Sequence, residues 1–246
     1  MEASVRSPML RVFCDFDGTT ASRDVGEQLF RRFAGAQAVE IVRGYLDGSI
    51  TARQCLRREC AAVESASPEE LERFIEQFAL DPHFNEFVLF CEARGIPVVI
   101  LSDGLDFYVG RMLRRDGLER LPFFANHLEF SQEGSSTKLV PSFPYTDSEC
   151  DQCANCKRNH LLTLSADDDI VVYVGDGMSD RCPVRYADVV FAKRNLIKYC
   201  QQQNISYHEY SHFGDVRTRL EQLLQKKRIK KRREAQMARR EVFLQG

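Results

Sequence analysis

Two acidic clusters, each directly after a short apolar run, most constrain what this chain can fold into. DFDGT, from Asp15 to Thr19, follows the run Leu10–Cys14, and GDGMSD, which contains Asp176 and Asp180, ends the run Ile170–Gly175. Apolar runs of this length are typical of buried strands in a parallel sheet. Open α/β sheets build their sites at the carboxyl ends of such strands, so we expect these carboxylates to meet there.

The pattern between the clusters predicts an α/β protein with a helical insertion. Further buried strands are predicted at Pro97–Leu101 and Asp188–Ala192, and strands also near 123–130 and 137–140. Helices alternate with the strands, which favours right-handed crossovers and a Rossmann-like parallel sheet. Residues 22–94 instead repeat apolar residues at helical spacing, and Ser67-Pro68-Glu69-Glu70 predicts a capping box there. We therefore predict a catalytic core at 1–20 and 95–220, a small helical cap at 21–94 that acts as a lid, and a mobile tail at 221–246.

The charge is unevenly distributed along the chain. The formal net charge is −2, yet residues 221–246 carry nine Lys or Arg against three Glu. We interpret this basic segment as a solvated chain end, and attachment to nucleic acid or an anionic membrane is the less favoured reading. No apolar run approaches the ~18 residues of a membrane span, and the first strand leaves no room for a secretory signal. We expect a cytoplasmic enzyme with reduced thiols and leave a homodimer open.

Four side chains are predicted to carry the chemistry, and each follows a strand or begins a helix. Asp15 is placed to attack phosphorus and become an aspartyl phosphate. Asp17 is two residues further along, on the same side of an extended segment, and can protonate the leaving oxygen and then deprotonate water. Ser102 can hold a phosphoryl oxygen, and Lys157 brings a positive charge to the same oxygens. Gly18 lets the backbone approach the phosphate.

Converging carboxylates repel one another unless a cation lies among them, which predicts a hard divalent ion. Oxygen ligands suit Mg²⁺, so we expect it to be held by the Asp15 carboxylate, the Asp17 carbonyl and Asp176. Asp180 would complete the pocket directly, or by orienting metal-bound water and Lys157.

Taken together, these motifs resemble those of the haloacid dehalogenase (HAD) phosphatases. DFDGT matches their first motif, Ser102 the second, Lys157 the third and GDGMSD the fourth, in order, over roughly residues 10–220. The helical block resembles the small C1-type cap of the phosphoserine-phosphatase branch. The resemblance implies Mg²⁺-dependent hydrolysis of a small phosphomonoester through a phosphoaspartate.

Within that branch, several sequence segments are most similar to those of the methionine-salvage phosphatases that act on 2-hydroxy-3-keto-5-methylthiopentenyl-1-phosphate. CDFDGT, LDFYV after Ser102, CxxCK before the third motif and VFAKRNLIKYC carry this similarity. GDGMSDRCP is instead similar to phosphoethanolamine and phosphocholine phosphatases. Asp103, beside Gly104, and Asp24 at the lid entrance would favour an ammonium-bearing leaving group. We therefore keep amino-alcohol phosphates and phosphoserine as alternatives.

A second cluster combines cysteines and a histidine. Cys150, Cys153, Cys156 and His160 could close a tetrahedral zinc site, although their spacing packs all four into one short stretch. Free thiols in a loop, or a redox-active pair, are the competing interpretations.

A non-catalytic function is the remaining alternative. The chain could act as a binding module whose basic segment docks on another molecule, but the presence of every catalytic group favours an enzyme. We expect a small phosphorylated metabolite as its partner, and we do not expect nucleic acid.

Overall fold

The computed structural model describes residues 9–133, 136–148 and 150–245. Residues 1–8 of the expected core and residue 246 of the expected tail lie outside that range. The described chain divides into two compact units. The first unit contains residues 9–14, 82–99 and 157–245, and the second contains residues 15–81 and 100–156.

The strands form one α/β sheet, which confirms the predicted fold class. The hydrogen-bonded order is β4-β3-β2-β1-β5-β6-β7. The β1–β5, β5–β6, β6–β7 and β2–β3 pairs are parallel, and only the β3–β4 pair is antiparallel among these. The strands are β1 (Leu10–Asp15), β2 (Val98–Leu105), β3 (Phe123–Glu133), β4 (Ser136–Ser142), β5 (Ile170–Gly175), β6 (Val189–Ala192) and β7 (His208–Glu209).

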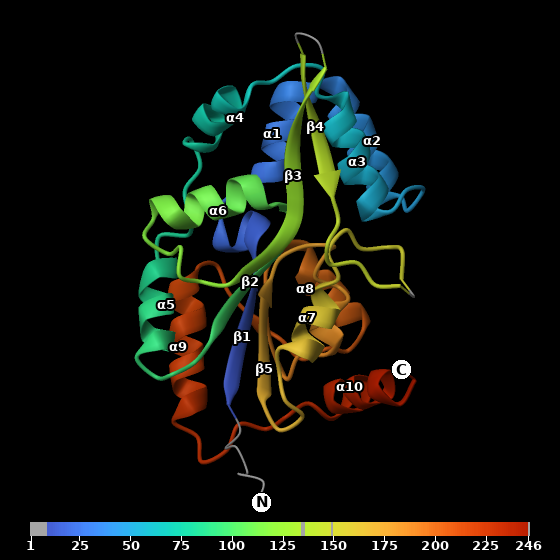
Figure 1. The fold of residues 1–246 in the computed structure, drawn as a ribbon. Helices are drawn as coiled ribbons and strands as arrows, with labels where there is room; N and C mark the ends of the chain where they lie inside the picture. Colours follow the sequence, from blue (N-terminus) through green and yellow to red (C-terminus); the bar gives the residue numbers. More distant parts are fainter. Residues whose placement is uncertain (1–8, 134–135, 149, 246) are drawn as a thin grey trace, which may run out of the picture. The chain divides into compact units, whose positions relative to one another are not determined.

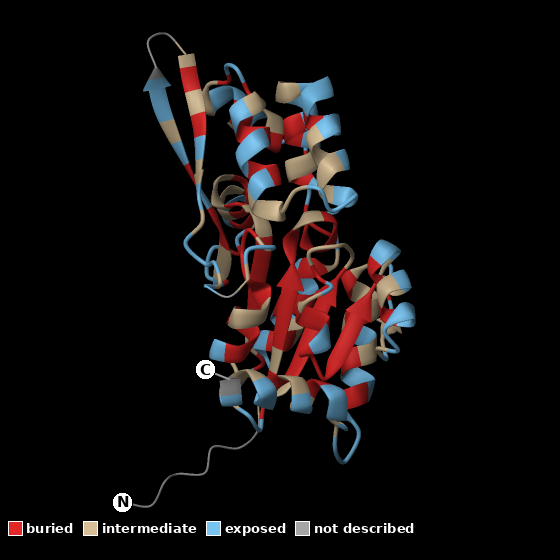
Figure 2. Ribbon diagram, turned by 90° about the vertical axis from the view of Figure 1, so that its right-hand side faces the viewer, coloured by how far each residue is buried: buried red, intermediate tan, exposed pale blue. Residues whose placement is uncertain are grey.

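The first unit is built on the paired strands β1, β5 and β6. Their residues are almost all buried, and Figure 2 shows these strands in red with the exposed residues on the surrounding helices and loops. β-Branched side chains dominate β5, as expected for a strand covered on both faces. The helices of this unit are α5 (Phe84–Glu92), α7 (Lys157–Thr163), η2 (Pro183–Arg185), α8 (Arg194–Gln202), α9 (Phe213–Leu224) and α10 (Arg233–Gln245).

Helix α5 lies with the first unit, although the sequence pattern places it in the helical cap. In Figure 1 it runs beside α9, and the rings of Phe84 and Phe87 lie 4.7 and 5.0 Å from that of Phe213. Aromatic packing of this kind contributes beyond simple burial, so α5 is held here by its apolar face. Residues 82–99, which include α5, thus belong to the first compact unit.

The second unit contains the helical block and an antiparallel ribbon. Its helical elements are η1 (Phe16–Thr20), α1 (Val25–Ala34), α2 (Ala36–Leu46), α3 (Ala52–Ala62), α4 (Pro68–Ile75) and α6 (Asp106–Arg115). The predicted capping box at Ser67 is present, with Pro68 at the first helical position. Gly35, at φ +58°, separates α1 from α2.

The two strands predicted near residues 123–130 and 137–140 form this ribbon. β3 and β4 pair from His127 with Ser142 to Glu133 with Ser136, and Figure 1 shows β4 beside α3. The guanidinium of Arg57 on α3 lies 5.1 Å from the centre of the Phe143 ring, just after β4. The ribbon is longer than the apolar pattern indicated, because polar residues continue the pairing beyond the buried part.

The basic segment contains helix α10, which packs on the rest of the first unit. Arg239 of α10 is only 5% exposed, and its guanidinium donates to the Tyr186 carbonyl and to both Asp188 carboxylate oxygens, at 3.2 and 3.1 Å for the latter pair. Arg232 donates to the Val184 carbonyl at 2.6 Å. Two arginines of the basic segment thus donate hydrogen bonds to backbone carbonyls and to a buried acid of the first unit. Among the described residues, none of the helices is long and apolar enough to cross a membrane.

Candidate active site

The first acidic cluster forms a tight turn at the end of β1. Asp15 is 4% exposed, and its carbonyl accepts the Thr20 hydroxyl at 2.7 Å. Gly18 adopts φ +73°, a conformation that suits glycine, and its amide donates to the Arg23 carbonyl at 3.1 Å. The turn therefore holds Asp15 and Asp17 in fixed positions on one short loop.

Asp17 is partly buried and has four hydrogen-bond donors. Its Oδ1 accepts the amides of Val25 and Gly26 at 2.9 and 3.3 Å, at the start of α1. Its Oδ2 accepts the hydroxyls of Tyr108 at 2.7 Å and Ser102 at 3.3 Å. Burial raises the pKa of Asp17, while the Tyr108 bond and the amides oppose that rise. Such a carboxyl is well placed to exchange a proton.

Tyr108 is a site residue that sequence reasoning missed. It lies in LDFYV on α6, fully buried, and its apolar pattern looked like ordinary helix packing. A Cβ on Gly104 would lie 1.5 Å from the Tyr108 hydroxyl oxygen and 2.9 Å from Asp17 Oδ2. A residue larger than glycine at position 104 would therefore displace the Tyr108 hydroxyl from Asp17. This requirement is separate from the predicted contact of Gly104 with the substrate.

Ser102 lies at the same place, and its neighbour Asp103 is tied into the fold. Ser102 Oγ accepts the Gly104 amide at 3.0 Å. Asp103 Oδ1 accepts the Asn155 amide at 2.9 Å, and the Asn155 side chain donates to the Ser102 carbonyl at 2.9 Å. Asn155, buried in the cysteine-rich loop, was not singled out from the sequence, because a loop asparagine carries no pattern.

Asp24 caps helix α1. Its carboxylate accepts the Glu27 amide at 2.8 Å, the bond expected of an N-cap residue. Asp24 therefore has a structural role at the start of α1. That Asp24 and Asp103 bind an ammonium group of the substrate stays a prediction.

The second acidic cluster belongs to the first unit, where Lys157 meets Asp180. Lys157 Nζ lies 2.9 Å from Asp180 Oδ1 and 3.0 Å from Ser179 Oγ, and both charged side chains are almost fully buried. Asp180 also accepts the Tyr173 hydroxyl at 2.6 Å and the Asp176 amide at 2.8 Å. The third and fourth sequence motifs are thus one hydrogen-bonded group.

Asp176 is held less tightly than Asp180 and keeps a solvent-facing partner. Its carboxylate lies 2.8 Å from the Arg194 guanidinium, which is half exposed. Burial, and then the Asp180 charge, raise the pKa of Asp176 to about 6, although Arg194 opposes the rise. Arg194 sits in AKRNL after β6 and was not predicted as a site residue. A carboxylate in such surroundings favours a nearby cation.

The strand pairing relates the two clusters. β1 and β5 are neighbouring parallel strands of the first unit, with Val12 opposite Val172 and Cys14 opposite Val174. Asp15 directly follows Cys14, and Asp176 directly follows Gly175, the last residue of β5. Both strands end at the same edge of the sheet, as predicted.

The cysteine cluster gives no support for zinc. In the described part of the second unit, Cys150, Cys153 and Cys156 do not form a group of ligands close enough to share an ion, and none of the three is in a disulfide. His160 belongs to α7 of the first unit and is 7% exposed. Burial lowers its pKa to about 4. Of the four candidate ligands, the three cysteines thus lie in a loop and the histidine lies on a helix.

We expect His160 to make stability fall in acid. Its folded pKa of about 4 is below the unfolded value of about 6.5, so the unfolded chain binds the extra proton first. The contribution is fully present above pH 6.5 and is lost as the pH falls toward 4, by up to about 3 kcal/mol. Urea unfolding from pH 8 to pH 4.5 should show a shallower loss for His160→Leu than for the wild type. Parallel curves for the two proteins would contradict this.

Similarity to known proteins agrees with this geometry. Residues 12–183 match the model of the haloacid dehalogenase-like hydrolase family. The chain is 30% identical over 222 residues to the 2-hydroxy-3-keto-5-methylthiopentenyl-1-phosphate phosphatase of Bacillus cereus (strain AH820), covering 89% of this chain and 99% of that protein. It is 28% identical over 221 residues to the enzyme of the same name from Bacillus mycoides (strain KBAB4), with the same two coverages.

Solved phosphoserine phosphatases share the fold. One, described as a phospho-aspartyl intermediate analogue, superposes with a TM-score of 0.66 at 19% identity, covering 88% of this chain and 99% of that one. The enzyme from T. onnurineus gives 0.65 at 15% identity, covering 89% and 98%. The family match spans most of the chain, and the relatives at higher identity are phosphatases. The chain therefore belongs to the haloacid dehalogenase-like hydrolase family, as a phosphoric monoester hydrolase.

Proposed function

We propose that this protein is a Mg²⁺-dependent phosphatase that hydrolyses a small phosphomonoester through an aspartyl phosphate on Asp15. The observation that carries the proposal is the β1–β5 pairing, which ends two neighbouring strands in Asp15 and Asp176. The neighbouring Asp17, partly buried and with a raised pKa, supplies the proton carrier that such a reaction needs.

The reaction takes place in two halves. A carboxylate oxygen of Asp15 forms a bond to phosphorus as the bond from phosphorus to the alcohol oxygen breaks, and Asp17 gives its proton to that oxygen. Water then attacks the aspartyl phosphate, Asp17 takes the proton back, and inorganic phosphate leaves with the Asp15 carboxylate restored. The hydroxyl of Ser102 and the charge of Lys157 hold the phosphoryl oxygens, and the amides after Gly18 assist.

The acidic donors fit a magnesium ion. Asp15, Asp176 and Asp180 each offer a carboxylate oxygen, and burial with the Asp180 charge raises the pKa of Asp176, so a cation would relieve that repulsion. These carboxylates, with the Asp17 carbonyl, would hold the ion. When bound, Mg²⁺ supplies positive charge that offsets the charge of the phosphoryl oxygens.

Two substrate classes are supported by different observations. The names of the Bacillus relatives favour 2-hydroxy-3-keto-5-methylthiopentenyl-1-phosphate. An amino-alcohol phosphate is the second candidate, because Glu59, in the helical segment after Asp17, is a buried acid. In either case we propose that this segment acts as a lid that excludes water during attack. The cytoplasmic location and a homodimer stay predictions.

The activity should depend on the divalent metal. For at least one phosphomonoester of a panel, we expect the hydrolysis rate in EDTA to be below about 1% of the rate in Mg²⁺. Excess Mg²⁺ should restore the rate. Phosphate release from the enol phosphate, phosphoserine, phosphoethanolamine and phosphocholine measures this. Full activity in chelator, with metal content checked by elemental analysis, would contradict the proposal.

Loss of the Tyr108 hydroxyl should slow turnover without unfolding the protein. Tyr108→Phe removes one donor to Asp17 Oδ2 and leaves the amides of Val25 and Gly26 in place. We expect kcat to fall about tenfold, the effect of one lost hydrogen bond of about 1.4 kcal/mol. Tyr207→Phe is the matched control, since that hydroxyl accepts from the Gln201 side chain in an exposed pair. Equal rates for the two variants would remove Tyr108 from the site.

A further inference from the structure

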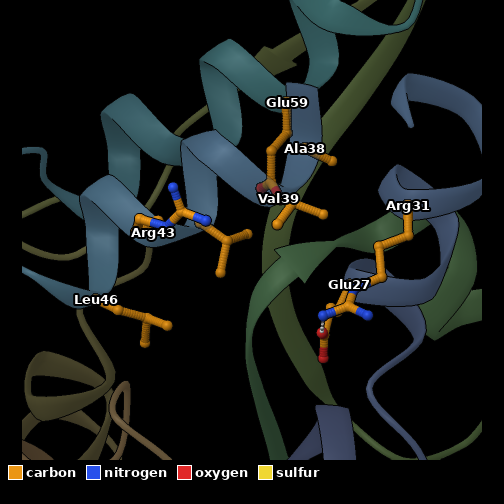
Figure 3. Close-up of a pocket in the computed structure, with 8 residues that line it drawn as sticks. Glu27, Arg31, Ala38, Val39, Arg43, Leu46 and Glu59 are labelled. Carbon is orange, nitrogen blue, oxygen red and sulfur yellow. Dashed lines mark ion pairs between the residues drawn. The ribbon is translucent and has the colours of Figure 1, made fainter. Parts of the chain in front are cut away.

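The second unit contains a small pocket between α1, α2 and α3. Its volume is about 200 Å³, suited to a group of a few non-hydrogen atoms. One wall is apolar and comes from α2, which contributes Ala38, Val39, Val42 and Leu46. Figure 3 shows the Glu59 side chain extending from α3 beside Ala38 and Val39. We call this cavity the α1–α3 pocket.

Glu59 is the buried acid of this pocket. It is 7% exposed, and its carboxylate has the Cys55 thiol as neighbour, at 3.6 Å. Within the described chain, no lysine, arginine or histidine forms an ion pair with Glu59. A carboxyl removed from water without a cation is costly, so its retention in a ligand-sized cavity indicates a role.

The basic side chains of the pocket are already paired with other acids. Arg31 lies 2.7 Å from Glu27, the pair joined by a dashed line in Figure 3, and Arg43 lies 2.7 Å from Glu40. Glu59 therefore has no cation to stabilise its ionised form. Burial, and to a smaller extent the Glu27 charge, raise the pKa of Glu59 to about 7, although the Cys55 thiol opposes the rise.

One residue that lines the pocket directly follows the two residues whose amides bond Asp17. The amides of Val25 and Gly26 hold Asp17 Oδ1, at 2.9 and 3.3 Å, and the next residue, Glu27, lines the pocket. The first turn of α1 thus connects the reacting end of the second unit to Glu59. When Asp17 protonates the leaving alcohol oxygen, the rest of that alcohol would extend along this turn.

We propose that the α1–α3 pocket binds the alcohol part of the substrate and that Glu59 receives an ammonium group on it. A substrate ammonium would supply the missing charge, and its carbons would contact the apolar wall of α2. The inference rests on the proposed phosphatase function and narrows its substrate to an ammonium-bearing phosphomonoester. This class differs from the enol phosphate named for the Bacillus relatives.

Kinetics with matched substrates test the inference. Phosphoethanolamine and propyl phosphate have similar size, but only the first carries an ammonium group. For the wild type with Mg²⁺, we expect kcat/KM to be at least about tenfold higher on phosphoethanolamine. Glu59→Gln should lower that value about 10- to 100-fold on phosphoethanolamine and change it less than about threefold on propyl phosphate.

Two further variants separate this effect from misfolding. Val39→Lys changes a half-exposed side chain of the pocket and places a competing ammonium there, so it should reproduce the selective loss. Glu64→Gln, an exposed acid just after α3, is the control that should leave both substrates unaffected. Equal losses on both substrates, or no loss for Glu59→Gln and Val39→Lys, would overturn the inference and leave the phosphatase intact. Absence of hydrolysis of any phosphomonoester would overturn the proposed function itself.

Discussion

An Asp15→Asn variant is expected to lose at least about 10⁴-fold in kcat, because an amide cannot form the aspartyl phosphate on which turnover depends. Asp15 is buried at the end of β1, and its carbonyl, which the change does not touch, accepts the Thr20 hydroxyl at 2.7 Å. The fold should therefore persist. Phosphate release under saturating substrate and Mg²⁺ measures the loss, and circular dichroism with the melting temperature monitors the fold.

The control for this experiment is an exposed acid of the same type. Asp168→Asn lies in the loop before β5, at the start of that strand rather than at its carboxyl end, and should keep the wild-type rate. Residual activity in Asp15→Asn within about tenfold of this control would exclude Asp15 as the nucleophile. A chemical trap for the intermediate, such as borohydride reduction of an acyl phosphate, should label the wild type alone.

Lys157→Met is expected to destabilise the protein by about 3 kcal/mol, in addition to any loss of activity. The ammonium lies 2.9 Å from Asp180, which is fully buried, and without it that carboxylate keeps neutral donors such as Tyr173 at 2.6 Å. Removing one member of a buried pair leaves an uncompensated charge in a poorly solvated place. The free energy of unfolding from urea titration at pH 7.5 measures the effect.

A double substitution identifies the cause of this loss. If the isolated Asp180 charge destabilises the variant, Lys157→Met with Asp180→Asn should recover part of the lost free energy. Lys198→Met, an exposed lysine of α8, should change stability by less than about 0.5 kcal/mol. A Lys157→Met variant as stable as this control would mean that the pair contributes nothing to the fold.

The strands and their carboxylates could be predicted because their signals are local. Apolar runs followed by Asp and Gly predict strand ends, and parallel pairing then brings Asp15 and Asp176 to one edge of the sheet. The capping box at Ser67 is equally local, and it appears as predicted. Motifs of this kind depend on a few consecutive residues, so the sequence contains all that is needed.

The supporting side chains could not be predicted, because their roles depend on distant partners. Tyr108 reaches Asp17 from 91 residues away, and Asn155 fixes the Ser102 strand end from 53 residues away. No local sequence pattern around either residue predicts its hydrogen bond. Glu59 likewise looks like one more charged residue of an exposed helix face, and only the packing of α1, α2 and α3 buries it.

The docking of α10 has a consequence for how the chain matures. The carboxylate of Asp188, at the start of β6, is fully buried and takes its cation from Arg239, 51 residues later. During synthesis the chain emerges from its amino end, so this acid stays uncompensated until α10, 51 residues further along the chain, has left the ribosome. Completion of the β-sheet core is thereby tied to the synthesis of α10, and a ribosome that stalls before residue 239 leaves the nascent core without this ion pair.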